Sequence, residues 1–449
     1  METPELITPH PGPHSRTFLE MTRAHESPGD TTFALSPEAV VEDRGEGPWI
    51  IDPDGNRYLD FMAGFGPAIT GHCHPRVVAA IRDQAGKLLH IMGAVNPVHA
   101  TLARRIVELA PGNVPRKVQF GNSGAEAVEI AIKMARFKTG KSEVLAFHGA
   151  FHGRTYGALS LMSKRYAREG LYPMVPGAVH VPYAYCYRCP FGKTYPSCDL
   201  ECARFVRYTV EGPATGVTEP AALIVEPIMG NGGMIVPPPE YLPALRKICD
   251  DNGMLLIADE VMSGWGRTGT LFAVEHTGVA PDILVTAKGI ASGLPLSAAI
   301  ARADIADVWT KAREGSTFSG NPVSCAAALA TLDVLRDERL AENAAAMGEY
   351  LAAGLRELAA QFPIVGDVRG RGLMAGIELV KDRESRAPLV RAAQQATDLA
   401  IREGLLLYPG GHYENVLSFL PPLIIGREHV DLAMGILRRV LAKVAGASR

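Results

Sequence analysis

Between residues 115 and 325, short runs of apolar and β-branched residues alternate with stretches of helical spacing. The strand candidates are "KVQF", "EVLAF", "ALIVE", "LLIADEV" and "DILVTAK". Each run is almost continuously apolar, as expected of strands that are covered on both faces. Strands that alternate with helices predict βαβ units on a mostly parallel sheet, so the fold class is α/β.

The pattern changes on either side of this region, which predicts three parts. Residues 1–60 are expected to form an N-terminal arm and part of the smaller domain, with a small hairpin, because "WIIDPDGNRYLDF" has an Asp-Gly turn signal. Residues 61–325 form a large domain around the sheet. Residues 326–449 begin with an alanine- and leucine-rich stretch suited to helix and continue with strand-like runs, "VRGRGLMAGIELV" and "NVLSFLPPLII". We expect them to form a smaller α+β domain.

Composition places the chain among soluble globular proteins. Of its 449 residues, 47% are hydrophobic and 21% are charged, which allows a large core. The net charge of −3 provides no basic field for nucleic acid or an anionic membrane. No run is long and apolar enough to span a bilayer. The first 16 residues lack the apolar run of a secretory signal, so we expect a cytoplasmic protein.

Three ionisable residues stand at the ends of three successive strand candidates: Glu226, Asp259 and Lys288. Ligands of open α/β sheets bind outside the carboxyl ends of the strands, so these side chains are expected to converge. Each alone is more simply a surface charge. A buried lysine, however, is costly unless it is paired, neutral or covalently engaged.

A further candidate is the turn in "VQFGNSGAEAVEIAIKMAR", where a strand gives way to a helix. Glycines and free N–H groups at a helix N-terminus can hold a phosphate, and Ser123 can add its hydroxyl. The alternative is an ordinary capped turn. A phosphate cradle, a buried acid and a strand-end lysine together suit pyridoxal phosphate.

Several motifs extend this interpretation to a family. "FGNSGAEAVEIAIKMAR", "FHGRT", "IVEPIMGNGG", "DEVMSGWGRTG", "AKG" and "STFSGNP" resemble, in order and spacing, the class III (ω-amino acid) aminotransferases of the pyridoxal-phosphate fold type I group. The resemblance runs from about residue 45 to the C-terminus. It implies a large domain with a mostly parallel sheet of seven-stranded type and a smaller α+β domain.

The resemblance also implies roles for individual residues. Lys288 would condense with the cofactor aldehyde and act as the general base, and Asp259 would pair with the pyridine nitrogen. Thr317 would reach the phosphate of the other subunit's cofactor, which implies a homodimer with shared active sites. The remaining cofactor-binding residues would cradle the phosphate (Ser123, Gly124, Ala125), cover the two ring faces (Phe151, Val261) or support the site (His152).

For the substrate, the resemblance assigns Arg369 to the carboxylate and Glu226 as its partner when no carboxylate is bound. The alternative is a structural ion pair. Met262 resembles the pyruvate-dependent branch of the family, but Tyr408 stands where that branch usually has an arginine. Two substrate patterns are therefore mixed, and the natural donor stays open.

The activity that follows is transfer of an amino group from an ω-amino acid or a primary amine to a keto acid such as pyruvate or 2-oxoglutarate. One alternative is an amino-acid racemase or epimerase on the same scaffold, and another is a non-enzymatic protein that retains the fold. We assign no metal to the site. Outside it, Cys186, Cys189, Cys198 and Cys202 could bind zinc, form disulfides or remain free thiols.

Overall fold

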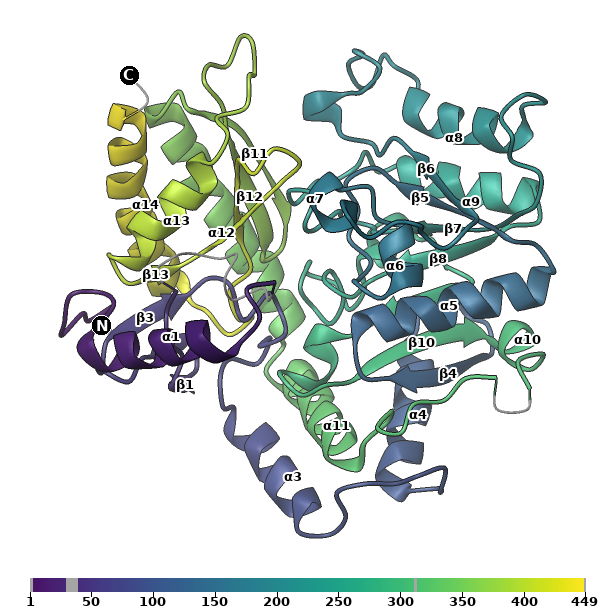
Figure 1. The fold of residues 1–449 in the computed structure, drawn as a ribbon, viewed down its shortest axis with the longest axis horizontal. Coiled ribbons are helices and arrows are strands. Elements are labelled where there is room, and N and C mark those ends of the chain that lie inside the picture. Colours follow the sequence, from purple (N-terminus) through teal and green to yellow (C-terminus); the bar gives the residue numbers. More distant parts are fainter. Residues whose placement is uncertain (1–2, 30–38, 311–312, 448–449) are drawn as a thin grey trace.

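The computed structural model describes residues 3–29, 39–310 and 313–447 (Figure 1). Its largest sheet has seven strands, and only β10 runs antiparallel to its neighbours. In spatial order the strands are β4 (Arg116–Gly121), β10 (Ser297–Arg302), β9 (Ile283–Thr286), β8 (Leu255–Asp259), β7 (Pro220–Val225), β5 (Glu143–Phe147) and β6 (Ala178–Val181). The predicted mostly parallel sheet is confirmed.

Helices cover both faces of this sheet. Successive residues of each strand point to opposite faces, so alternate apolar residues pack against different helices. Val144, Ile224 and Ile257 pack against α5 (Gly124–Thr139). Leu145, Leu223 and Leu256 lie in the cluster on the other face, with α8 (Glu201–Glu211) and α9 (Tyr241–Asp251).

Two smaller sheets lie to the left of the large one in Figure 1. The first orders β11 (Val365–Arg371), β12 (Met374–Leu379), β15 (Val416–Phe419) and β14 (Tyr408–Gly410), and the second β1 (Arg44–Glu46), β2 (Trp49–Ile51), β3 (Arg57–Asp60) and β13 (Leu405–Leu406). The hairpin predicted at the Asp-Gly signal is confirmed as the β2–β3 pair. β13 pairs with β3, so residues from both ends of the chain share one sheet.

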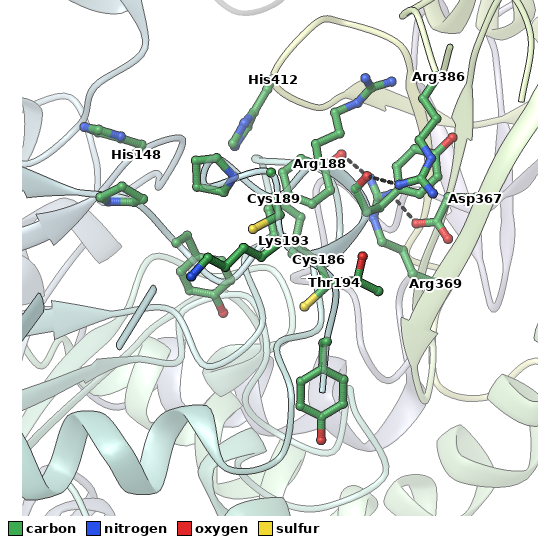
Figure 2. A pocket seen from close by; sticks show the side chains of 18 of the residues that line it. His148, Cys186, Arg188, Cys189, Lys193, Thr194, Asp367, Arg369, Arg386 and His412 are labelled. Atoms are coloured by element: carbon green, nitrogen blue, oxygen red, sulfur yellow. Dashed lines mark hydrogen bonds and ion pairs between the residues drawn. The ribbon is translucent and has the colours of Figure 1, made fainter. Parts of the chain in front are cut away.

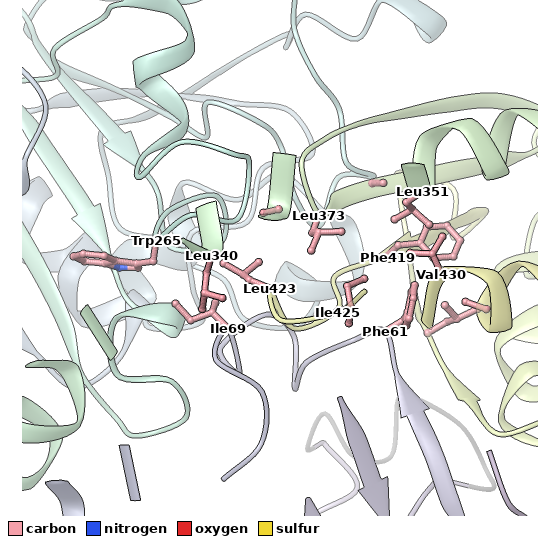
Figure 3. Packing of buried hydrophobic residues seen from close by; sticks show 14 of the residues in the cluster. Phe61, Ile69, Trp265, Leu340, Leu351, Leu373, Phe419, Leu423, Ile425 and Val430 are labelled. Atoms are coloured by element: carbon pink, nitrogen blue, oxygen red, sulfur yellow. The ribbon is translucent and has the colours of Figure 1, made fainter. Parts of the chain in front are cut away.

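The remaining helices flank these sheets and join them to the large one. They are α1 (Pro13–His25), α3 (Pro75–Ala85), α4 (Pro97–Leu109), α6 (Tyr156–Ser160), α7 (Arg165–Arg168), α10 (Ala303–Ala306), α11 (Pro322–Asp337), α12 (Leu340–Gln361), α13 (Ala392–Ile401) and α14 (Arg427–Ala447), with short 3₁₀ turns at Cys186–Arg188, Ala273–Thr277 and Lys288–Ala291. A continuous apolar cluster connects the parts: Phe61, Trp265 and Phe419 come from three distant segments (Figure 3). The site is thus held by one shared core.

The four-cysteine segment precedes and enters α8. Cys186, Cys189, Cys198 and Cys202 line one small cavity, and all four are free thiols. In the part of the chain that the structure describes, no group of three metal-ligating side chains is placed to hold an ion. Within the same part, every helix is too short or too polar to cross a membrane.

Candidate active site

The three strand-end residues meet at one edge of the large sheet. Strands β7, β8 and β9 are neighbours there, and Asp259 lies opposite Val285 in the ladder. Lys288 follows β9 with a left-handed backbone (φ +43°), at the start of a 3₁₀ turn. This turn ends the strand and leaves the lysine at its carboxyl end, beside Asp259.

Asp259 is held by two hydrogen bonds in a dry environment. Its Oδ1 accepts the N–H of Val261 at 3.0 Å, and its Oδ2 lies 2.7 Å from Nδ1 of His152. Only 4% of Asp259 and 3% of His152 is exposed. Burial acts to lower the pKa of His152, but the hydrogen bond and charge of Asp259 outweigh it and raise that pKa. His152 therefore favours its charged form and fixes the orientation of the carboxylate.

Glu226 fastens two loops beside this pair. Its Oε1 accepts the N–H of Phe151 at 2.8 Å, and its Oε2 accepts the N–H of Gly230 at 2.9 Å. Burial raises the pKa of Glu226, and the nearby charge of Asp259 adds to the effect. The carboxylate positions the segment that carries Phe151 and His152.

Lys288 lies in surroundings that favour its neutral amine. Burial lowers its pKa to about 8, although Asp259 and Glu226 act to raise it. Arg267 adds a positive charge nearby; it is fully buried and donates to the backbone carbonyls of Leu373 and Gly66, at 3.1 and 3.3 Å. A lysine with such a pKa can act as both nucleophile and general base near neutral pH.

The helix α5 begins directly beside these groups. Ser123 is its N-cap, and its hydroxyl accepts the N–H of Glu126 at 3.2 Å. The first N–H groups of a helix have no partner within the helix, so those of Gly124 and Ala125 can bind an anion. A Cβ added to Gly124 would lie 3.0 Å from Val261, so glycine permits this close approach.

Thr317 lies on an exposed loop, as does its neighbour Phe318, which is 63% exposed. The loop is tied to the cradle of its own chain, because Asn122 donates to the hydroxyl of Ser316 at 2.9 Å. Within one chain, Thr317 faces outward at the edge of the site.

Arg369 does not pair with Glu226, and that expectation is wrong. Its Nη1 contacts Asp367 at 2.6 Å and Glu378 at 2.8 Å, and its Nε donates to the carbonyl of Gly233 at 2.7 Å. Figure 2 shows Arg369 and Asp367 of this network beside a cleft of about 950 Å³. Glu226 does not pair with Arg369 because both of its carboxylate oxygens accept backbone N–H groups, those of Phe151 and Gly230.

Comparison with known proteins identifies the family. Residues 34–441 match the family model described as Aminotransferase class-III. The chain belongs to this family. The predicted membership of the class III aminotransferase family is confirmed, and with it the use of pyridoxal phosphate as the cofactor.

Individual relatives of this class III aminotransferase carry different names. It is 37% identical over 448 residues to an alanine/serine racemase of Pyrococcus horikoshii (98% of this chain, 93% of the relative). It is 38% identical over 409 residues to the 5-aminovalerate aminotransferase DavT of Pseudomonas aeruginosa (90% and 94%). A solved amine transaminase from an uncultivated Pseudomonas species, in the PLP-bound form, superposes with a TM-score of 0.85 at 33% identity (98% and 100%). The fold type I prediction is confirmed.

The residues of this class III aminotransferase fit pyridoxal phosphate. Nε2 of His152 is buried without a partner in the described residues, and the close packing of Gly124 against Val261 leaves backbone N–H groups as the cradle. Ser123, Gly124 and Ala125 would hold the phosphate, Asp259 the ring nitrogen and Lys288 the aldehyde carbon. When bound, the cofactor supplies an electron sink for the substrate carbanion.

Several polar residues around the site were missed from sequence. Glu378 lies inside the apolar run "LMAGIELV", and a carboxylate at such a position signals a buried partner. Tyr185 and Arg188 donate to it from the cysteine segment. Lys164 and Asn231 lie in loops, where no periodic pattern marks them.

Proposed function

We propose that the protein moves an amino group from an ω-amino acid or a primary amine, of the γ-aminobutyrate, β-alanine or amine type, to a keto acid such as pyruvate or 2-oxoglutarate. The observation that carries this proposal is the position of Lys288. It lies beside the buried Asp259–His152 pair, and the N-terminus of α5 adjoins the same group of residues. The family and the amine transaminase and DavT relatives support it.

Each residue of the site would have a separate role in this reaction. Lys288, with its pKa lowered by burial, would remove and return the proton at the substrate carbon. Asp259, oriented by His152, would keep the proton on the ring nitrogen. Phe151 and Val261 would cover the two faces of the ring. The burial of the Asp259–His152 pair would keep water away from the ring.

A second candidate is racemisation or epimerisation of an amino acid. The alanine/serine racemase of Pyrococcus horikoshii, which matches over 98% of this chain, favours it. Both reactions begin with removal of a proton by the lysine. In racemisation the proton would return to the same substrate carbon and the amino group would stay on its own skeleton, whereas in transfer the amino group would stay with the cofactor.

One experiment separates the two activities. The cofactor-loaded protein is incubated with single donors, γ-aminobutyrate, β-alanine, 1-phenylethylamine or L-alanine, with and without 2-oxoglutarate or pyruvate. Transfer predicts an aldehyde or ketone product whose amount follows the added acceptor. Loss of optical activity of L-alanine without any acceptor, and no amino transfer from the other donors, would overturn the proposal in favour of racemisation.

We also propose a homodimer whose active sites are shared, with Thr317 reaching the partner's cofactor phosphate. Four large apolar residues between α3 and α4 are exposed, Leu88, Leu89, Met92 and Val95, by 47, 61, 80 and 92%. Exposed apolar area of this kind marks protein interfaces. Asn321 donates to the carbonyl of Leu89 at 2.7 Å, so this segment adjoins the loop of Thr317.

We propose that the enzyme works in the cytoplasm. Its seven cysteines are free thiols in the described structure, which suits a reducing compartment.

A further inference from the structure

A class III aminotransferase that accepts keto acids needs a cation for their carboxylate, and Arg369 is poorly placed for that task. Two carboxylates, Asp367 and Glu378, already contact its guanidinium, and Tyr185 lies 3.2 Å from its Nη2. Asp367 is partly exposed, but Glu378 is fully buried. Freeing Arg369 would leave a buried carboxylate with one partner fewer, which is costly.

Lys164 has a different set of partners. Its ammonium donates to the side-chain and main-chain oxygens of Asn231, the latter at 3.1 Å, and to the carbonyl of Gly411 at 3.5 Å. Among the described residues, all of these acceptors are neutral. Burial lowers the pKa of Lys164 to about 8, while the more distant charges of Glu226 and Glu414 act to raise it. The side chain is thus a partly buried cation without a carboxylate in hydrogen-bond contact.

A chain of contacts connects Lys164 to the catalytic lysine. Asn231 also donates to the hydroxyl of Tyr408, and the Tyr408 ring packs edge-on against Phe65 at 5.0 Å between centroids. The next residue, Gly66, faces Lys288: a Cβ added to Gly66 would lie 4.0 Å from Cδ of that lysine.

The loop that carries Asn231 approaches the site from a second side. Its preceding residue, Gly230, donates to Glu226, which also holds Phe151 beside the cofactor position. Met262, next to the ring-covering Val261, packs against Gly230. Two routes therefore connect Lys164 to the reacting centre, one through Asn231, Tyr408 and Phe65 and the other through the loop of Gly230 and Asn231 to Glu226.

We propose that Lys164 is the residue that binds the substrate carboxylate, with Asn231 and Tyr408 positioning it. This inference rests on the proposed aminotransferase function and specifies its substrates as carboxylate-bearing donors and keto acids. An arriving carboxylate replaces the neutral oxygens of Asn231 around the ammonium and gains a charge-assisted hydrogen bond. The ring of Phe65 offers an apolar surface for the carbon chain, and simple amines bind there without the ion pair.

The main test is the Lys164→Met variant, which keeps the side-chain length and removes the charge. Two ligands are titrated calorimetrically into the cofactor-loaded protein: butyrate, and butyramide as its neutral counterpart. We expect the Kd of butyrate to rise about tenfold to a hundredfold, the usual range for a hydrogen bond to a charged group. The Kd of butyramide should change by less than about twofold, and Lys164→Arg should recover part of the butyrate affinity.

A kinetic measurement runs beside the titration. In single-turnover reactions, Lys164→Met should raise at least tenfold the 2-oxoglutarate concentration that gives half the maximal rate. The same variant should slow the reaction with 1-phenylethylamine by less than about threefold. If the unmodified protein does not react with 1-phenylethylamine or γ-aminobutyrate, the aminotransferase proposal fails, whereas butyrate binding still tests Lys164.

Arg369→Met and Arg154→Met serve as comparison variants, because Arg369 lines the cleft of Figure 2 and Arg154 is an exposed cation two positions after His152, close enough to Tyr408 to affect its pKa. The proposal predicts a smaller loss of butyrate affinity in both than in Lys164→Met. It is overturned if Lys164→Met leaves the Kd of butyrate within twofold, or if either arginine variant causes the larger loss. Melting curves show whether each variant is folded, and Lys164→Gln replaces a variant that is not.

Discussion

At the scale of single residues, the site depends on how buried charges are matched. Asp259 has the imidazole of His152 on one oxygen and a backbone N–H on the other. A carboxylate held in this way has a fixed orientation and can accept a hydrogen bond from a protonated pyridine ring. Lys288 is buried without a hydrogen-bonded carboxylate in the described structure, so its amine is easily neutralised.

The Asp259→Asn variant tests the carboxylate directly. An amide cannot stabilise a protonated ring nitrogen, so we expect kcat to fall by about 100-fold, equivalent to about 2.7 kcal/mol in activation free energy. Steady-state kinetics with γ-aminobutyrate and 2-oxoglutarate would measure it, with Asp199→Asn at an exposed position as control. A kcat within about threefold of the unmodified enzyme would contradict the role of Asp259.

The residues at strand ends could be predicted from sequence because each is a charge after an apolar run. The partner of Arg369 could not. Asp367 and Glu378 are close to Arg369 in sequence, but their contact with it depends on the register of β11 against β12, and only the segment before α8 comes from far away in the chain. The sequence allowed Glu226 to pair with Arg369, but both carboxylate oxygens of Glu226 accept backbone N–H groups, those of Phe151 and Gly230.

At the scale of elements, continuous apolar runs predicted five strands of the large sheet, and two were missed. β10, "SAAIAR", is rich in alanine, whose intrinsic preference is helical, and only its place between β4 and β9 makes it a strand. The long alanine-rich stretch forms two helices, α11 and α12, because Arg339 adopts a left-handed backbone between them (φ +51°). Tertiary packing therefore overrides local preference in β10, whereas the alanine-rich stretch follows its helical preference on both sides of Arg339.

The ion-pair network on β11 and β12 gives a prediction about stability. Glu378 is buried and contacts both Arg369 and Arg188. Glu378→Gln removes the charge that both guanidinium groups share, and breaking a buried pair in this way costs about 3–5 kcal/mol. We therefore expect a lower Tm by calorimetry.

The exposed residue Glu384 provides the control for this change. Glu384→Gln should melt within about 1 °C of the unmodified protein, since exposed charges contribute little. An equal Tm for the two variants would show that the network does not stabilise the fold.

At the scale of the whole molecule, the apolar segment between α3 and α4 and the loop of Thr317 belong to one surface. The rings of His90 and Phe318 lie 5.5 Å apart and connect the two. A partner chain on this surface would cover the exposed leucines and complete the phosphate site.

Sedimentation tests this assembly. We expect the enzyme to sediment as a dimer, and Leu89→Glu with Met92→Glu to weaken the dimer at least tenfold and to lower activity at low protein concentration. Phe18→Glu, at a residue 48% exposed on α1, serves as control and should leave the dimer intact. A fully active monomer would contradict shared active sites.

The central claim is that the nitrogen of Lys288 bonds to the cofactor aldehyde. Borohydride reduction of the cofactor-loaded protein, followed by digestion and mass spectrometry, tests it most directly. The account predicts one phosphopyridoxyl group per chain, attached to Lys288, and none at that position in Lys288→Ala. A label at another lysine, such as Lys164, or none at all, would contradict it.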